Sequence, residues 1–295
     1  MIHWSNILQI LGIFILILSA TIGLVALFAL LRDEPVFSSL ALACVMTLGI
    51  GTVLALYYRT SIREFNRRDG IILVVFVWFS ASFLGAFPFF FSGFFPSFTD
   101  AFFESISGFT ATGATILEEI EVLPDSLLLW RSFIQWFGGM GIILLAIAIL
   151  PLIGVGGIEL YRAEFSGSRS ERLTPRLSQT ATSLWKLYFG FTLAEYLCLR
   201  WAGMNNFESI CHSFTTMATG GFSTRNSSIQ SFDNPTIEYI LVIFMLLGGI
   251  NFTRHYQLIV ELRPLSFLRD TEFRFYCAII VVTTAAVVLV SNFPS

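Results

Sequence analysis

Two short segments combine threonine and glycine in a way that suits the coordination of a cation. Thr112-Gly113 and Thr219-Gly220 each end a short amphiphilic stretch, residues 100–111 and 208–217. Backbone carbonyls and threonine hydroxyls supply oxygen, and glycine adopts the positive φ angles that let successive carbonyls point the same way. One isolated Thr-Gly pair is more simply a helix C-cap or turn. Because two copies occupy matched positions, we favour an ion-coordinating role for both.

Long apolar runs surround these segments. The chain of 295 residues is 55% hydrophobic and 13% charged, whereas soluble domains carry ~25% charged residues. Its mean hydropathy is +0.77. Most of the runs exceed the ~20 residues that span a hydrocarbon core as a helix, and backbone groups in lipid must be satisfied internally. We therefore predict an all-α polytopic membrane protein. The runs are 7–31, 36–58, 70–99, 132–157, 239–253 and 275–295.

The order of the segments repeats. A spanning helix, a half-helix too short to cross, a Thr-Gly loop and a second spanning helix occur twice, and Gly113 and Gly220 are 107 positions apart. Such a period indicates duplicated units. We predict repeated helix–pore loop–helix units after an N-terminal helical hairpin. The expected helices are 70–91, 100–111 and 127–152 in the first unit, and 186–201, 208–217 and 237–253 in the second.

These units divide the chain as follows: 1–60, hairpin; 70–152, first repeat; 153–185, cytoplasmic linker; 186–255, second repeat; 256–274, cytoplasmic linker; 275–295, first helix of an incomplete third repeat. The same period places further filter glycines at about 327 and about 434. We expect that residues 1–295 alone insert into the membrane but do not conduct selectively, because a ring of carbonyls needs loops on all sides.

Positive charge gathers in alternate connections, which the positive-inside rule makes cytoplasmic. Glu118, Glu119, Glu121 and Asp125 lie in an intervening connection, which we expect to face outward. The positive clusters are Arg59, Arg63, Arg67 and Arg68; Arg162, Arg169, Arg172, Arg176 and Lys186; and Arg254, Arg263, Arg269 and Arg274.

Several strings resemble one known family. Phe103 to Thr115 is similar to the first pore loop of the Trk/Ktr potassium-uptake proteins, and the N-terminal hairpin favours their TrkH-type members. The chain then matches the N-terminal part, about two and a half of four pore repeats. The other matching strings are Trp130-Arg131-Ser132, Gln135 to Ile142, Leu150-Pro151, Ala163-Glu164-Phe165, Leu173 to Arg176, Cys211 to Phe214, Met217 to Ser223 and Gly248 to Phe252.

The resemblance implies K⁺ uptake through a channel-like pore in the bacterial inner (plasma) membrane, with K⁺ as the transported ion and no covalently bound cofactor. It also implies a homodimer and a cytoplasmic TrkA-type nucleotide-binding regulatory subunit, and no nucleic-acid partner. The pore loops lack the Gly-Tyr-Gly ending of potassium channels, so a Na⁺-conducting or Na⁺-coupled relative stays open. Carried over by position, the selectivity filter would use the carbonyls of Ala111, Thr112, Gly113, Ala218, Thr219 and Gly220.

Other polar residues carry weaker hypotheses. The acids around Glu121 either concentrate cations at the outer mouth or form a solvated loop. Asp100 and Glu208 suit the positive ends of the half-helices. Glu195 lies inside a predicted span and has either a transport role or a place at the outer interface. We expect His212 to be a packed side chain rather than a metal ligand. Gly138, Gly139 and Gly141 permit close helix contact or motion.

Three other classes of function compete with K⁺ uptake. A membrane enzyme would need a nucleophile and base or an HExxH motif, and the sequence has neither. Sodium transport by the same architecture is separable from K⁺ transport by ion-replacement flux. The third alternative is an inactive or partial fragment of such a transporter.

Overall fold

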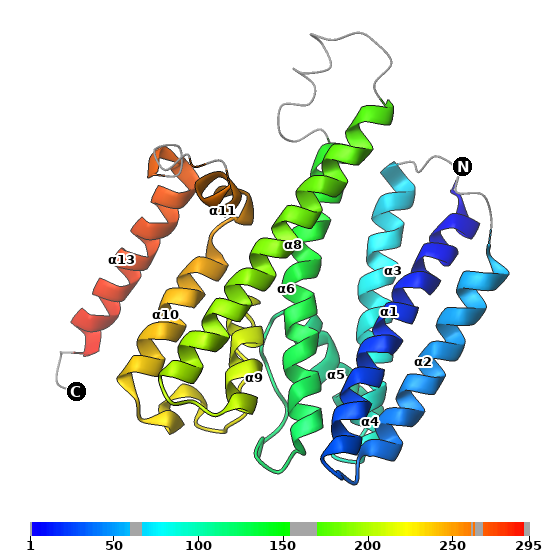
Figure 1. The fold of residues 1–295 in the computed structure, drawn as a ribbon, viewed down its shortest axis with the longest axis horizontal. Helices are drawn as coiled ribbons and strands as arrows, with labels where there is room; N and C mark the ends of the chain where they lie inside the picture. The colour runs from blue at the N-terminus through cyan, green and yellow to red at the C-terminus, as the bar shows by residue number, and fades with distance from the viewer. Residues whose placement is uncertain (1, 60–66, 154–169, 261, 263–267, 292–295) are drawn as a thin grey trace.

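The computed structural model describes residues 2–59, 67–153, 170–260, 262 and 268–291, which form an all-helical bundle (Figure 1). Within these residues, four helices are long and apolar enough to cross a membrane, and a bent helix pair would make a fifth. The prediction of an all-α polytopic membrane protein is confirmed. Three parts of the earlier expectations lie outside the described residues: the string Ala163-Glu164-Phe165, residues Arg162 and Arg169, and residues Arg63 and Arg263.

The N-terminal hairpin consists of α1 (Trp4–Leu31) and α2 (Phe37–Tyr57). A side chain at Gly12 would overlap the backbone of α2, so the two helices approach closely there. The turn between them binds the start of α6: Glu34 Oε2 accepts hydrogen bonds from the Ser126 amide at 3.2 Å and the Ser126 hydroxyl at 2.5 Å. The expected packing hairpin is therefore attached to the first repeat.

The first repeat contains α3 (Arg67–Gly85), α4 (Phe87–Ser92), α5 (Phe98–Phe109) and α6 (Asp125–Ile153). Gly93, with φ of +79°, ends α4 in the left-handed conformation. The twelve residues of α5 are too few to cross a bilayer.

The second repeat contains α8 (Ser170–Trp201), α9 (Asn206–Met217), the short 3₁₀ helix η1 (Ser228–Phe232) and α10 (Pro235–Gly249). The helix expected to start at residue 186 begins at Ser170 instead. The polar residues before position 186 form the first turns of the same helix. Both half-helices, α5 and α9, lie in the lower half of Figure 1, at the end of the molecule that carries the turn between α1 and α2.

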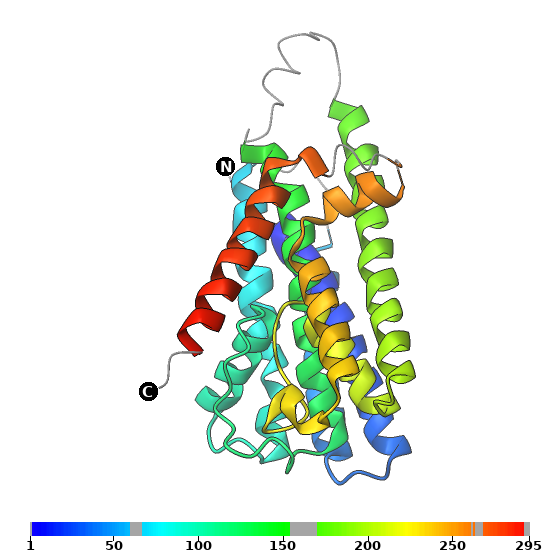
Figure 2. The ribbon, with the colours of Figure 1, turned by 90° about the vertical axis from the view of Figure 1, so that its left-hand side faces the viewer.

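The expected span 237–253 is wrong at its inner end. The chain bends by 100° between α10 and α11 (Phe252–Ile259). Ile250 is extended, and Asn251 Oδ1 accepts the Thr253 amide at 3.0 Å, which starts a new helix. Helix α13 (Thr271–Ser291) follows and stands at the edge of the bundle in Figure 2.

An aromatic cluster joins the two repeats. Trp136 of α6 lies 5.2 Å from the Phe214 ring of α9 and 5.5 Å from the Tyr188 ring of α8, measured between centroids. Phe133 lies 5.0 Å from Phe214. Helix α6 thus belongs to the first repeat but forms much of the packing surface of the second.

Candidate functional site

The first half-helix ends in a Schellman turn. The Thr112 amide donates to the Ser107 carbonyl at 2.9 Å, and the Ala111 amide donates to the Gly108 carbonyl at 2.9 Å. Ala111 has φ of 52°, and Gly113 has φ of 75°. Alanine rarely adopts this conformation, so the turn is held by its surroundings.

The second half-helix ends in the same way. The Gly220 amide donates to the Thr215 carbonyl at 2.9 Å, and the Thr219 amide donates to the Thr216 carbonyl at 2.9 Å. The φ angles are 54° at Thr219 and 83° at Gly221. The simpler expectation of a helix C-cap is thus true of both segments, and it leaves the carbonyls of the turns available for ion coordination.

The two loops correspond at a spacing of 108 residues, not 107. Ala111 matches Thr219, and Gly113 matches Gly221 by its positive φ. The expected equivalence of Gly113 with Gly220 is therefore wrong by one position. Equivalent residues in the helices that follow the loops are 110 positions apart. Gly138 of α6 contacts Phe109 at the end of α5, and Gly248 of α10 contacts Met217 at the end of α9 in the same way. Loop two is thus two residues longer.

The loops meet at two glycines. A side chain at Gly113 would overlap the Gly220 carbonyl oxygen, and one at Gly220 would overlap the Gln135 side chain. Gln135 is fully buried, and its Oε1 accepts the Phe222 amide at 3.1 Å. Glycine is thus required at position 113, where the neighbour is backbone, whereas a side chain at position 220 would have to displace the end of Gln135.

Two glycines of α6 contact both half-helices. A side chain at Gly138 would overlap the Phe109 carbonyl at the end of α5, and one at Gly139 would overlap Ala218 at the end of α9. Gly141 lies against Trp78 of α3. The expectation of close helix contact at these glycines is confirmed.

A buried ion pair lies behind the first loop. Arg131 Nε donates to Glu104 Oε1 at 2.8 Å, and both side chains are at most 1% exposed. Glu104 also accepts the Thr115 hydroxyl at 3.0 Å and the Ile116 amide at 3.4 Å. The carboxylate therefore ties the half-helix to the chain that leaves the loop.

The same arginine reaches the second loop. Arg131 Nη1 donates to the Ser223 carbonyl at 3.0 Å, and the guanidinium lies over the Phe222 ring at 4.2 Å from its centroid. Arg131 thus links the first half-helix to the second loop from α6, and Gln135, one turn later, also binds the second loop.

His212 takes the position of Glu104 in the second repeat, 108 residues later. Its Nε2 lies 3.5 Å from the Thr224 hydroxyl, and its ring meets the Phe232 ring edge-on at 5.4 Å. It is 2% exposed. The expectation of a packed histidine is confirmed, and the described residues contain no cluster of metal-ligating side chains.

The half-helices begin with matched caps. Ser97 Oγ accepts the Asp100 amide at 3.2 Å, and Asn205 Oδ1 accepts the Glu208 amide at 2.8 Å. Asp100 and Glu208 lie in the first turns, where a carboxylate suits the positive helix end. The C-terminal ends, which carry partial negative charge, lead into the two loops.

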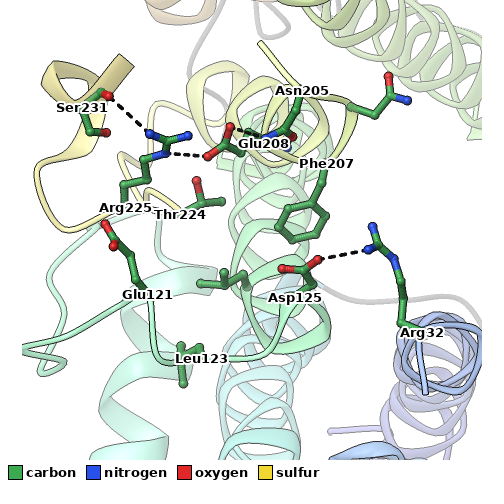
Figure 3. A pocket seen from close by; sticks show the side chains of 12 residues that line it. Arg32, Glu121, Leu123, Asp125, Asn205, Phe207, Glu208, Thr224, Arg225 and Ser231 are labelled. Carbon is green, nitrogen blue, oxygen red and sulfur yellow. Dashed lines mark hydrogen bonds and ion pairs between the residues drawn. The ribbon is translucent and has the colours of Figure 1, made fainter. Parts of the chain in front are cut away.

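A polar cavity of about 630 Å³ opens beside the start of α9 (Figure 3). Arg225 Nε donates to Glu208 at 2.6 Å, and this bond raises the pKa of the guanidinium above its ordinary value. Glu121 and Asp125 also line the cavity, and Asp125 lies 3.6 Å from Arg32. Two of the four acids in the predicted outer connection therefore contribute to a shared polar surface.

Sequence reasoning assigned no role to Glu104, Arg131 or Gln135. The sequence does mark two of these residues. Arg131 and Gln135 are polar and four positions apart, so they lie on one face of an otherwise apolar helix. The partners of Arg131 lie 27 and 92 positions away, so spacing alone does not identify them.

Residues 38–293 match the family model of the cation transport protein TrkH. The chain is 41% identical over 279 residues to the Trk system potassium uptake protein TrkH of Escherichia coli K12, covering 94% of this chain and 58% of that protein. It is 38% identical to TrkH of Halomonas elongata, covering 97% of this chain and 61% of that protein. The chain thus spans about three fifths of these relatives.

The crystal structure of the potassium transporter TrkH from Vibrio parahaemolyticus is similar to this fold. Its TM-score is 0.86 at 37% sequence identity, covering 95% of this chain and 57% of that chain.

Proposed function

Because this chain belongs to the TrkH family of cation transport proteins, we propose that it forms part of a channel-like pore for potassium uptake. The relatives are named as potassium uptake proteins. In this proposal, backbone carbonyls of the two Schellman-turn loops line the ion path. They belong to Ala111, Thr112, Gly113, Ala218, Thr219 and Gly220, with Gly221 as the counterpart of Gly113.

The observation that carries the proposal is the contact between the two loops. Gly113 meets the Gly220 carbonyl, and two half-helices lead into this point. Among the described residues, the carbonyls of Ala111, Thr112 and Gly113 accept no hydrogen bond. Unpaired carbonyls at membrane depth are tolerated where water or an ion satisfies them.

The resemblance supports further parts of the proposal. We place the protein in the bacterial plasma membrane, as a homodimer with a cytoplasmic TrkA-type nucleotide-binding subunit. The end of the bundle with the cavity of Figure 3 faces outward in this arrangement. Loops from other repeats or chains would complete the ring of carbonyls around the ion.

Radioactive rubidium uptake tests the proposal. The full reading frame would be expressed in bacteria that lack their own potassium uptake, and uptake would be competed with K⁺ or Na⁺. We expect K⁺ to compete and Na⁺ to compete much less. Equal competition by Na⁺ would favour a sodium-conducting protein, and no uptake from membrane-inserted protein would refute transport by this chain.

A further inference from the structure

Helix α8 turns a narrow buried stripe toward the bundle. Leu193 and Leu197 are exposed on the opposite face, as expected of side chains that meet lipid. The stripe follows helical spacing. Its members are Leu184, Tyr188, Thr192, Glu195 and Leu199.

Glu195 is the acid in this stripe, and it is 0% exposed. Neither carboxylate oxygen has a hydrogen-bond partner among the described residues. The Thr216 side chain of α9 is its polar neighbour. The side chain therefore faces the bundle rather than lipid or solvent.

None of the ion pairs in the described part of the chain includes Glu195. On its own helix, Tyr188 donates its hydroxyl to the Trp136 carbonyl at 3.0 Å. On α10, Glu238 and Tyr239 are exposed. The titratable groups on the other packed helices engage elsewhere: Arg131 with Glu104, Glu208 with Arg225, Asp125 with Arg32, Arg254 with Asp270, His212 with Thr224, and His255 with the Leu247 carbonyl.

A buried carboxylate without a partner is strongly disfavoured. A metal cation would relieve the charge only with several oxygen ligands, and the part of the chain that the structure describes has no group of metal-ligating side chains here. A proton relieves the same charge and needs a single acceptor. The surroundings therefore select a proton.

We propose that Glu195 is a proton-binding site behind the second pore loop, where its protonated carboxyl donates a hydrogen bond to the Thr216 hydroxyl after a small side-chain adjustment. Thr216 also accepts the Thr219 amide through its carbonyl, at 2.9 Å. The proposed proton site is thus linked through Thr216 to the turn that carries the proposed ion path. The inference concerns protonation and holds whether or not the loops conduct.

Infrared spectroscopy of the purified full-length protein in lipid tests this site directly. A protonated carboxylic acid has a carbonyl stretch that an ionised carboxylate lacks, and it shifts in D₂O. We expect this band at neutral pH in the unaltered protein and its loss in Glu195→Gln. Glu208→Gln is the matched control, because Glu208 is ion-paired with Arg225 and should contribute no such band.

A second variant tests the acceptor and does not depend on whether Glu195→Gln folds. Thr216→Val should retain the band but shift it to higher frequency, because the carboxyl loses its hydrogen bond. Thr215→Val, whose hydroxyl bonds the His212 carbonyl at 3.3 Å, should leave it unmoved. Absence of any acid band at neutral pH, or a band that persists in Glu195→Gln, would overturn the proton site. An unshifted band in Thr216→Val would overturn its acceptor. Because none of these readouts requires transport, failure of the proposed function leaves them interpretable.

Discussion

Arg131 provides one guanidinium to two loops. Its ion pair reaches 27 positions back to Glu104, and its hydrogen bond reaches 92 positions forward to Ser223. Hydrogen bonds to charged groups contribute about 1.5–3 kcal/mol, and loss of one partner from a buried ion pair costs about 3–5 kcal/mol. The relative positions of the two loops therefore depend on this side chain.

We expect Arg131→Lys to keep the charge opposite Glu104 but to lose the bond to Ser223. The free energy of unfolding should fall by about 1.5–3 kcal/mol, and rubidium uptake should discriminate less against Na⁺. Thermal unfolding in detergent and competition flux measure the two effects. Arg32→Lys is the control, since its pair with Asp125 is largely exposed and contributes about 0–1 kcal/mol. Unchanged selectivity in Arg131→Lys would show that Arg131 does not position the loops.

Gly113 and Gly93 distinguish two effects of replacing a glycine, which are backbone strain and overlap with a neighbour. Both have positive φ, 75° and 79°, but only Gly113 has a neighbour, the Gly220 carbonyl, within reach of an added Cβ. Gly93→Ala should cost about 1–2 kcal/mol, from backbone strain alone. Gly113→Ala should cost more and abolish selective uptake, because its methyl overlaps the second loop. Equal thermal stability and equal uptake of the two variants would contradict the close approach.

At the scale of helices, sequence pattern predicted the half-helices well. Their observed starts, Phe98 and Asn206, lie two residues before the expected ones, because Ser97 and Asn205 cap them. The inner end of α10 was missed, since nothing in an apolar run shows that Asn251 will start a second helix. The register of the loops was also missed by one residue, because the second loop has two consecutive glycines and the second of them, Gly221, matches Gly113.

Loss of one cap tests how far a half-helix depends on its outer end. Ser97→Ala removes the acceptor for the Asp100 amide, and we expect about 1 kcal/mol lower stability. Ser227→Ala is the control, because Ser227 precedes η1 without a side-chain cap bond. Thermal unfolding compares them. An equal effect of both substitutions would show that the cap contributes nothing specific.

At the scale of the whole molecule, alternation of charge predicted which helix ends lie together. The start of α3 and helix α11, which carry positive charge, lie at one end of the bundle, and the acidic chain between α5 and α6 lies at the other (Figure 1). The length of the apolar runs was sufficient to predict a membrane protein. The bridge from α6 to both loops was beyond such reasoning, since it depends on contacts between distant segments.

Single-cysteine labelling tests the orientation. In a variant without the four native cysteines, Glu121→Cys should react with an impermeant maleimide from outside the cell. Arg59→Cys should react only after the membrane is opened, because positive connections stay in the cytoplasm. Labelling of position 121 from the cytoplasmic side alone would reverse the topology and the uptake direction.

The shared guanidinium also sets an order of events during synthesis. Glu104 and Arg131 emerge from the ribosome close together, but Ser223 follows Arg131 by 92 residues, a delay of roughly 5–20 s at ordinary elongation rates. During that interval, Arg131 has its carboxylate partner Glu104 but lacks its contact with the second loop at Ser223. We therefore expect the nascent chain to hold Arg131 with only one of its two partners, and crosslinking of stalled chains can measure when the second loop arrives. Slower translation before residue 223 would lengthen the exposure of this intermediate to quality-control proteases.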